Sequence, residues 1–304
     1  MDTKTIKVDS QVTEQILTDI FEEIFKAGRI PDIGFIRHIL RSMLHKPVTN
    51  FSQFIARLDA LIRDHGFVEA AGIAIDELSG GFRAVGADHI PQSGPVIIAS
   101  NHPGTYDGFA LIANLQRDDF KIMVSGVPFF RHLPNASKYL IYSTQDVNDR
   151  MQAIRQSIAH LRAGGALLIF PSGRIDPDPA VLPGAEKALS QWSRSILVFM
   201  RKVQDASLVL AITSGVLSKE ITTSLYPKFF RNDHERRRVM EFMQVIRQMV
   251  RGKPVSVNPR VSFAKPISQL FDLNADPDKL QAQIHQQATA LLQAHQAAFS
   301  LPRF

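Results

Sequence analysis

A histidine and an aspartate five residues apart are the residues of this chain best placed to do chemistry. His102 and Asp107 lie in the stretch NHPGTYDG, residues 101–108, which directly follows the apolar run VIIAS. A histidine with an ordinary pKa of about 6.5 can accept a proton at neutral pH, and a carboxylate bonded to its other ring nitrogen makes it a better base. The spacing indicates a general base with an orienting carboxylate. It fits equally well a structural role, as a helix cap or a hydrogen bond within a loop.

A second polar loop has the same position relative to a strand. The stretch PSGRIDPDP, residues 171–179, follows the apolar run ALLIF. In α/β sheets the loops at the carboxyl ends of the strands carry the chemistry. The two loops are therefore predicted to form one shared site.

The elements that must position these loops alternate along the chain. Short apolar runs predict strands at 96–100, 120–125, 139–144, 166–170, 207–213 and 255–264. Helical periodicity predicts helices at 107–116, 148–165, 183–203 and 233–250. Such alternation is typical of the α/β class, here a mixed sheet flanked by helices.

The first part of the chain contains only helical patterns, and so predicts a small helical bundle ahead of the sheet. Apolar residues recur with the helical period over 11–28, 32–45, 50–66 and 67–79, and Asn50 is a plausible N-cap for the third of these. The sequence SGGF, residues 79–82, interrupts the pattern. We therefore expect a helical domain over residues 1–79 and an α/β domain over residues 80–304.

The composition excludes several kinds of site. The chain has no cysteine, so it has no disulfide, no thiolate nucleophile and no cysteine-based zinc site. The sequence also shows no nucleophile elbow, phosphate-binding Walker loop or metal-ligand cluster. No apolar run approaches the ~18–20 residues of a membrane span, and the polar, acid-containing N-terminus is unlike a signal peptide. We expect a cytoplasmic protein, either soluble or peripheral on the inner face of the membrane.

The net charge of +6 favours an anionic partner, and by itself leaves open nucleic acid, an anionic membrane, an acidic carrier protein or a phosphorylated substrate. Eight basic and three acidic residues lie within 228–253, among aromatic residues and methionines. This pattern predicts a membrane or carrier contact. The alternative is a solvated helix that packs its apolar side inward.

Four stretches occur in a recognisable order: VIIASNHPGTYDG, VSGVPFFRHLP, LLIFPSGRIDPDP and LVLAITSGV. With them, roughly residues 82–270 resemble the phospholipid/glycerol acyltransferase superfamily, the PlsC-like enzymes. The resemblance implies that His102 and Asp107 form the catalytic pair. It also implies that the block from Gly126 to Arg131, which includes Phe129, helps to form the acceptor site.

The third stretch departs from the usual pattern of that superfamily. Ser172 stands where most members have glutamate, and Gly173 and Arg174 follow it. In this respect the chain is similar to the soluble chloroplast-type glycerol-3-phosphate acyltransferases, which also have an N-terminal helical bundle. Their pattern has two glycines and two arginines where this chain has one of each, and their Lys-His pair is here part of the sequence TQD, residues 144–146. Fewer basic residues are thus available for a phosphate.

The resemblance implies transfer of a fatty acyl group from an acyl carrier protein or coenzyme A thioester to a glycerol-phosphate acceptor. It implies no metal, no redox cofactor and no nucleic-acid partner. Three other functions stay open: acylation of a non-phosphorylated alcohol, thioester hydrolysis, and lipid or membrane binding without catalysis.

The individual residues have alternatives too. Arg174 could hold a phosphate or pair with Asp176 or Asp178, and Gly173 could approach a ligand or form a plain turn. Phe129 could line an acyl channel or pack in the core.

Overall fold

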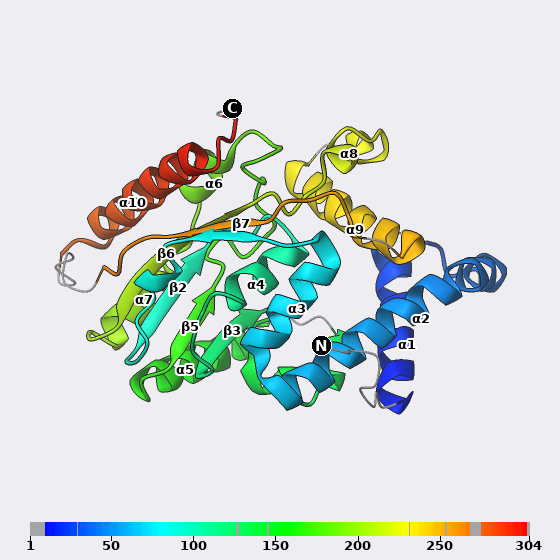
Figure 1. The fold of residues 1–304 in the computed structure, drawn as a ribbon, viewed down its shortest axis with the longest axis horizontal. Helices are drawn as coiled ribbons and strands as arrows, with labels where there is room; N and C mark the ends of the chain where they lie inside the picture. Colours follow the sequence, from blue (N-terminus) through cyan, green and yellow to red (C-terminus); the bar gives the residue numbers. More distant parts are fainter. Residues whose placement is uncertain are drawn as a thin grey trace.

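The protein is described from a computed structural model, which places residues 10–28, 30–125, 128–144, 146–230, 232–252, 254–267 and 275–302. Within these ranges, seven strands form a single sheet with helices on both faces (Figure 1). The predicted fold class, a mixed α/β sheet flanked by helices and preceded by N-terminal helices, is confirmed.

The sheet has the strand order β1-β7-β6-β2-β5-β3-β4. Every neighbouring pair is parallel except β6 and β7, which are antiparallel. The strands are β1 (Arg83–Val85), β2 (Val96–Ser100), β3 (Phe120–Val124), β4 (Leu140–Tyr142), β5 (Ala166–Ile169), β6 (Ser207–Ser214) and β7 (Arg260–Phe263). Because β6, β2, β5, β3 and β4 are all parallel, their carboxyl ends lie at one edge of the sheet.

The two faces of the sheet contribute to different hydrophobic clusters, because successive side chains of a strand point to opposite faces. In β2, Val96 and Ile98 belong to one cluster, whereas Ile97 and Ala99 belong to the other. All four side chains are fully buried. A strand buried on both faces has no polar alternation, which is why β2 appears in the sequence as a continuous apolar run.

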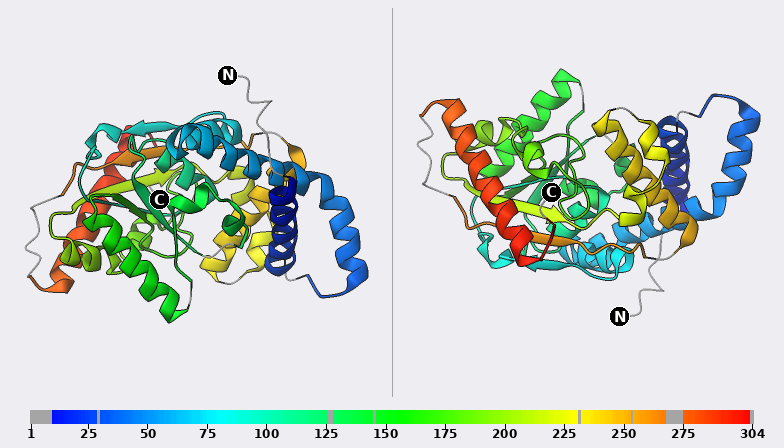
Figure 2. Two further views of the ribbon diagram at one scale, coloured as in Figure 1. Left: turned by 90° about the horizontal axis from the view of Figure 1, so that it is seen from below. Right: turned by 90° about the horizontal axis from the view of Figure 1, so that it is seen from above.

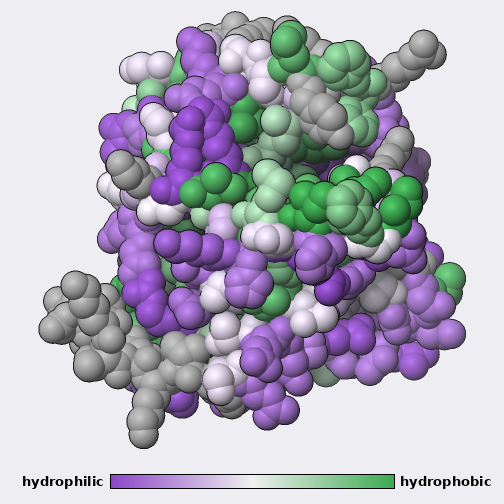
Figure 3. All heavy atoms as spheres, turned by 90° about the vertical axis from the view of Figure 1, so that its right-hand side faces the viewer, coloured by the Kyte–Doolittle hydropathy of each residue, from purple (hydrophilic) through white to green (hydrophobic). Residues whose placement is uncertain are grey.

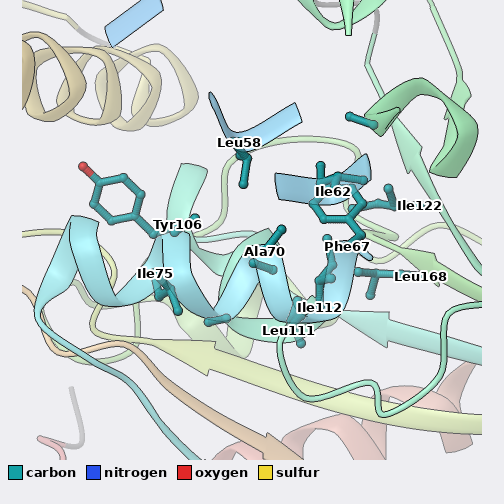
Figure 4. Close-up of a cluster of buried hydrophobic side chains, with 14 of the residues drawn as sticks. Leu58, Ile62, Phe67, Ala70, Ile75, Tyr106, Leu111, Ile112, Ile122 and Leu168 are labelled. Carbon is teal, nitrogen blue, oxygen red and sulfur yellow. The ribbon is translucent and has the colours of Figure 1, made fainter. Parts of the chain in front are cut away.

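Helices cover both faces. On one face lie α2 (Gly34–His65), α3 (Phe67–Ser79) and α4 (Thr105–Ile112), and Figure 4 shows their side chains packed with those of the strands. On the other face lie α5 (Val147–Arg162), α6 (Ala185–Leu189), α7 (Ser195–Lys202) and α10 (Pro277–Ala298). The remaining helices are α1 (Ser10–Ala27), α8 (Lys219–Thr222) and α9 (Asp233–Arg251), with short 3-10 turns at η2 (Ala87–His89), η3 (Pro128–His132), η4 (Ala136–Tyr139) and η5 (Tyr226–Phe229).

The N-terminal helices differ from the prediction at one place. A single helix, α2, runs through Pro47, so the prediction of two helices with an N-cap at Asn50 is wrong. A proline inside a helix removes one backbone hydrogen bond and commonly kinks the helix. Figure 2 shows that the two halves of α2 run in different directions. The second half stays helical because Ile55, Leu58 and Ile62 pack into the core.

These helices also support the chain that follows β3. Asp19 of α1 lies 3.1 Å from Nε2 of His132 in η3. The buried carboxylate of Asp59 in α2 accepts hydrogen bonds from the backbone N–H groups of Asn135 and Ala136, at 3.1 and 2.8 Å. The N-terminal helices and the sheet also contribute side chains to one hydrophobic cluster. The division into domains at residue 79 stays a prediction.

Smaller differences concern the C-terminal half. The helix predicted over 183–203 is two helices, α6 and α7, and the strand predicted over 255–264 is shortened to β7. The edge strand β1 and the helix α10 were not predicted. None of the helices in the described ranges is long and apolar enough to cross a membrane.

Candidate active site

The site forms where three neighbouring parallel strands end. β2 lies between β6 and β5, and their last residues are Ser100, Ser214 and Ile169. The loops that follow these strands therefore meet at the same edge of the sheet. This brings the predicted polar loops 101–108 and 171–179 together, as the sequence indicated.

His102 and Asp107 form a hydrogen-bonded pair. Nδ1 of His102 lies 2.8 Å from Oδ2 of Asp107. Asp107 is in the first turn of α4, and the same oxygen accepts a hydrogen bond of 3.1 Å from the backbone N–H of Gly104. The side chain of His102 is 28% exposed, whereas that of Asp107 is 1% exposed. Asp107 is thus a buried anchor, and the ring of His102 reaches solvent with Nε2 available.

Two neighbours fix the imidazole further. The ring of Phe170, directly after β5, stacks on that of His102 with centroids 4.5 Å apart. The side chain of the preceding Asn101 is bonded to the backbone of Thr213 in β6, through its Oδ1 at 2.8 Å and its Nδ2 at 2.9 Å. The loop that carries His102 is therefore held by both neighbouring strands.

Asp176 closes the loop after β5 onto the backbone of His102. The N–H of His102 donates to Oδ2 of Asp176 at 3.0 Å, and the N–H of Asp176 donates to the carbonyl of His102 at 2.7 Å. Burial raises the pKa of Asp176, and its hydrogen bonds and the charges of His102 and Arg237 oppose this. Asp176 is a structural partner of His102.

Asp178 performs a similar task for the loop after β6. Its fully buried carboxylate accepts hydrogen bonds from the N–H groups of Gly215, Val216 and Leu217 at 2.8–2.9 Å, and from that of Ala180 at 2.9 Å. Burial raises the pKa of this carboxyl group, and the four N–H groups counteract it. Neither aspartate of the DPDP segment forms a salt bridge within the described ranges, so the alternative that they pair with Arg174 is not what the structure shows.

The charges around His102 favour its protonated form. Burial lowers the pKa of His102, but the carboxylates of Asp107, Glu241 and Asp176 more than offset this effect and raise the pKa to about 9. At neutral pH the imidazolium form therefore prevails in the free protein. A histidine with this pKa is a strong base, but its imidazolium form must lose a proton before the ring can accept one.

The turn after β5 is exposed and contains the remaining residues predicted in the third stretch. Gly173 has φ of 61°, and a side chain there would meet nothing within 4 Å. Glycine is thus favoured by the backbone conformation of a turn. The hydroxyl of Ser172 donates to the carbonyl of Arg174 at 2.8 Å, and the guanidinium of Arg174 donates to Gln191 at 2.6 Å. Arg174 is exposed to solvent.

The block after β3 is more distant, because β5 lies between β3 and β2, the strand that precedes His102. Phe129 and Phe130 contact each other with ring centroids 4.7 Å apart, and both pack against the larger hydrophobic cluster. The guanidinium of Arg131 lies over the ring of Tyr142, 5.8 Å from its centroid. These contacts do not include His102 or Asp107. Gly126 lies outside the described residues.

Like the stacking of Phe170, the contribution of α9 to the site was not predicted from the sequence. Oε1 of Glu241 is hydrogen-bonded to the hydroxyl of Thr105, and Glu241 attracts His102 electrostatically. Nε of Arg237 donates to the carbonyl of Ile175 at 2.8 Å. The sequence shows both residues only as part of a charged segment, because Glu241 lies 139 positions after His102 in the chain. Across the described ranges, no three potential ligands gather as a metal site.

Comparison with known proteins gives one family. The family described as Acyltransferase matches residues 81–257, more than half of the chain. No curated protein matches. Among solved structures, the chain is similar to the 1-acyl-sn-glycerophosphate (LPA) acyltransferase PlsC from Thermotoga maritima, with 14% identity and a TM-score of 0.46. That similarity covers 93% of this chain and 98% of the other.

Proposed function

The chain belongs to the Acyltransferase family, and from this premise we propose that it transfers a fatty acyl group from a thioester to the hydroxyl group of a glycerol phosphate. The observation that supports the proposal most directly is the 2.8 Å contact between His102 and the buried Asp107 at the carboxyl end of β2. The acceptor would be glycerol 3-phosphate or lysophosphatidate.

In the proposed reaction, His102 acts as a general base. Asp107 accepts the hydrogen bond of Nδ1–H, so Nε2 of the neutral ring is left to remove the proton of the acceptor hydroxyl. The acceptor oxygen attacks the thioester carbonyl and forms a tetrahedral intermediate. When the carbon–sulfur bond breaks, the imidazolium returns the proton to the leaving thiolate. The products are an ester and a free thiol.

The oxyanion of that intermediate needs N–H donors. The N–H groups of His102, Gly104 and Gly173 already donate to Asp176, Asp107 and the carbonyl of Phe170. We therefore assign this task to the first turn of α4. The N–H groups of Thr105 and Tyr106 lie there, and the helix offers them no carbonyl four residues earlier in the chain.

The phosphate of the acceptor is assigned to Arg174. Its guanidinium is exposed, stands on a glycine turn at the edge that carries His102, and is bonded to an uncharged side chain, Gln191. Arg237 of α9 lies within electrostatic reach of Arg174, and the two guanidinium groups make this part of the site positive. A positive site suits a phosphate dianion.

The donor would be an acyl carrier protein or coenzyme A thioester. Both are acidic, in keeping with the net charge of +6. We retain the basic segment 228–253 as the proposed carrier or membrane contact, although Phe242, Val245 and Ile246 of α9 pack inward. Arg238 and Arg251 are exposed on this helix.

The proposed location is cytoplasmic, with a peripheral contact at the inner face of the membrane. Figure 3 views the side of the molecule where α2 and α9 lie, and hydrophobic side chains gather on this face. On the first half of α2, Phe35 is 74% and Met43 is 71% exposed. Exposed apolar side chains grouped on one helix are typical of an interfacial contact.

An acceptor screen tests the proposed reaction. Purified protein is mixed with acyl-CoA or acyl carrier protein donors and with glycerol 3-phosphate, lysophosphatidate or neutral alcohols, and the released thiol is measured with a thiol reagent. The protein adds no background, because it has no cysteine. We expect thiol release that depends on a phosphorylated acceptor, together with an ester product in the mass spectrum. Release with neutral alcohols alone, or without any acceptor, would replace the proposal with a neutral-alcohol acyltransferase or a thioester hydrolase.

The variant Arg174→Ala tests the phosphate assignment. A charge-assisted contact contributes about 1.5–3 kcal/mol, so the KM for the acceptor should rise roughly 10- to 150-fold. The KM for the acyl donor should stay unchanged. Arg194→Ala serves as the control, because Arg194 is paired with Asp278 in α10. Equal changes in the two KM values would show that Arg174 does not bind the phosphate.

A further inference from the structure

The helix α9 turns a row of polar side chains toward the loops at the catalytic edge. Arg237 is bonded to the carbonyl of Ile175 in the loop after β5. Gln244 is buried; its Nε2 donates to the carbonyl of Val216 at 2.7 Å, and its Oε1 accepts from the N–H of Ser218 at 2.6 Å. Residues spaced by three, four or seven lie on one face of a helix. Glu241 lies between Arg237 and Gln244 on this face.

The anchors on both sides fix the position of Glu241 over the first turn of α4. Its carboxylate is hydrogen-bonded to the hydroxyl of Thr105. A methyl group placed on Gly104 would lie 3.8 Å from Cγ of Glu241. Gly104 is also the residue whose N–H holds the carboxylate of Asp107. Glu241 is therefore packed on the turn that carries the candidate catalytic pair, and α9 ties all three loops of the site together.

The charged groups that face His102 come from three elements. Asp107 belongs to α4, Asp176 to the loop after β5, and Glu241 to α9. Glu241 in turn faces His102 and Arg238, which attract it, and Asp107, which repels it. Burial raises the pKa of Glu241, and His102 is the strongest influence in the opposite direction. The carboxylate of Glu241 and the imidazolium of His102 thus stabilise each other.

We propose that Glu241 is a positioning residue for His102, supplied by α9, whose carboxylate stabilises the imidazolium that forms when His102 removes the proton of the acceptor. This inference rests on the proposed function, in which His102 is the base. Glu241 acts through His102 and through Thr105, and forms no bond with the substrate in this proposal. It makes His102 a stronger base and moves the working range of the protein to higher pH.

The test is a titration of the His102 imidazole by NMR in the free, full-length protein, with the signal assigned from its loss in His102→Ala. In Glu241→Gln the pKa of His102 should fall by about one pH unit, because one opposite charge near the ring is removed. In Glu241→Asp, which keeps the charge, the pKa should lie between the two. Asp205→Asn is the matched control, because Asp205 is exposed and precedes β6, at the opposite edge of the sheet.

The titration is independent of turnover. If no acyl transfer is detected, the proposed function fails while the titration still decides the role of Glu241. If Glu241→Gln does not fold, Thr105→Val replaces it: loss of the hydroxyl frees the carboxylate, and the pKa of His102 should fall by a smaller amount. A pKa of His102 that is unchanged or higher in the folded variant, or that falls equally in Asp205→Asn, would overturn the proposal.

Discussion

His102 faces three carboxylates, and its charge determines when it can act as a base. Asp107 fixes Nδ1, Phe170 stacks on the ring, and the backbone bonds with Asp176 hold the residue in place. The pKa of about 9 that results lies above the ordinary value for histidine. Only the fraction of protein in which Nε2 has lost its proton can begin the proposed reaction.

The first prediction concerns the pH dependence of acyl transfer. Because the pKa of His102 is raised to about 9, the neutral base becomes more abundant as the pH rises through this value. The kcat/KM should therefore increase by roughly 10- to 50-fold between about pH 7 and pH 9 and then level off. The kcat/KM at each pH is measured from thiol release, after the rate of thioester hydrolysis without protein has been subtracted. A profile that is flat over this range would contradict the charge state that we assign to His102.

Among the residues of the candidate site, the sequence predicted the pairing of those that are close together along the chain. His102 and Asp107 could be found because one turn of chain separates them. The partners contributed by distant segments could not, since Glu241 and Phe170 become neighbours of His102 only through the strand order and the placement of α9. Asp176 was noticed, but as a partner of Arg174. Its partner in the structure is the backbone N–H of His102, and a backbone group cannot be identified as a partner from the sequence.

At the level of secondary-structure elements, a buried histidine joins α10 to the sheet. His295 is fully buried, and its two ring nitrogens are bonded to Ser214 of β6 and Ser262 of β7 at 2.7 and 2.8 Å. These are the two antiparallel strands of the sheet. Burial and the charge of Arg260 lower the pKa of His295 to about 4.

The second prediction is a loss of stability in acid that depends on His295. In the unfolded chain its pKa is about 6.5, so between about pH 6.5 and pH 4 the unfolded state binds a proton that the folded state does not. The stabilisation is complete above this range and is lost as the pH falls. The difference in free energy of unfolding between the wild type and His295→Gln should shrink by roughly 3 kcal/mol from pH 7 to pH 4.

Denaturant unfolding at several pH values measures this difference. The exposed His38 provides a control, and His38→Gln should leave the difference from the wild type constant. If His295→Gln behaved in the same way, the buried histidine would not be the source of the acid sensitivity.

The element boundaries show what a local pattern can and cannot predict. The continuous apolar runs of β2, β5 and β6 identified these strands, because they are buried on both faces. The sequence predicted two helices, 32–45 and 50–66, where the structure has the single helix α2 running through Pro47. The cost of a proline is local, whereas the packing that keeps the second half of α2 helical involves distant residues. The short edge strand β1 has only three residues and one partner, β7, which is too little for a periodic signal.

For the molecule as a whole, the N-terminal helices and α9 lie on the same side of the edge that carries the candidate site, with α2 in contact with α9 (Figure 1). The exposed apolar residues of α2 therefore lie on a helix that contacts α9, and hydrophobic side chains gather on this side of the molecule (Figure 3). Between residues 33 and 58 the chain has no acidic residue. We therefore propose that α2 is the first part of the protein to contact an anionic lipid surface.

The third prediction tests that approach. In Phe35→Glu/Met43→Glu, two exposed apolar side chains are replaced by charges, and binding to vesicles that contain phosphatidylglycerol should weaken by at least about tenfold. Co-sedimentation measures the binding. The matched control is Val147→Glu/Met151→Glu on α5, where the two side chains are 62% and 46% exposed. Equal losses in both variants, or none in the first, would rule out α2 as the contact.

The central claim is that His102 is the base of an acyl transfer, and the most direct measurement is the kcat/KM of His102→Ala for thiol release with the preferred acceptor. The substitution removes the ring and its bond with Asp107, but keeps the backbone N–H that donates to Asp176, so the fold should persist. We predict that kcat/KM falls by at least about 10²–10⁴-fold while the unfolding transition remains cooperative. A folded His102→Ala protein with nearly wild-type kcat/KM would contradict the account.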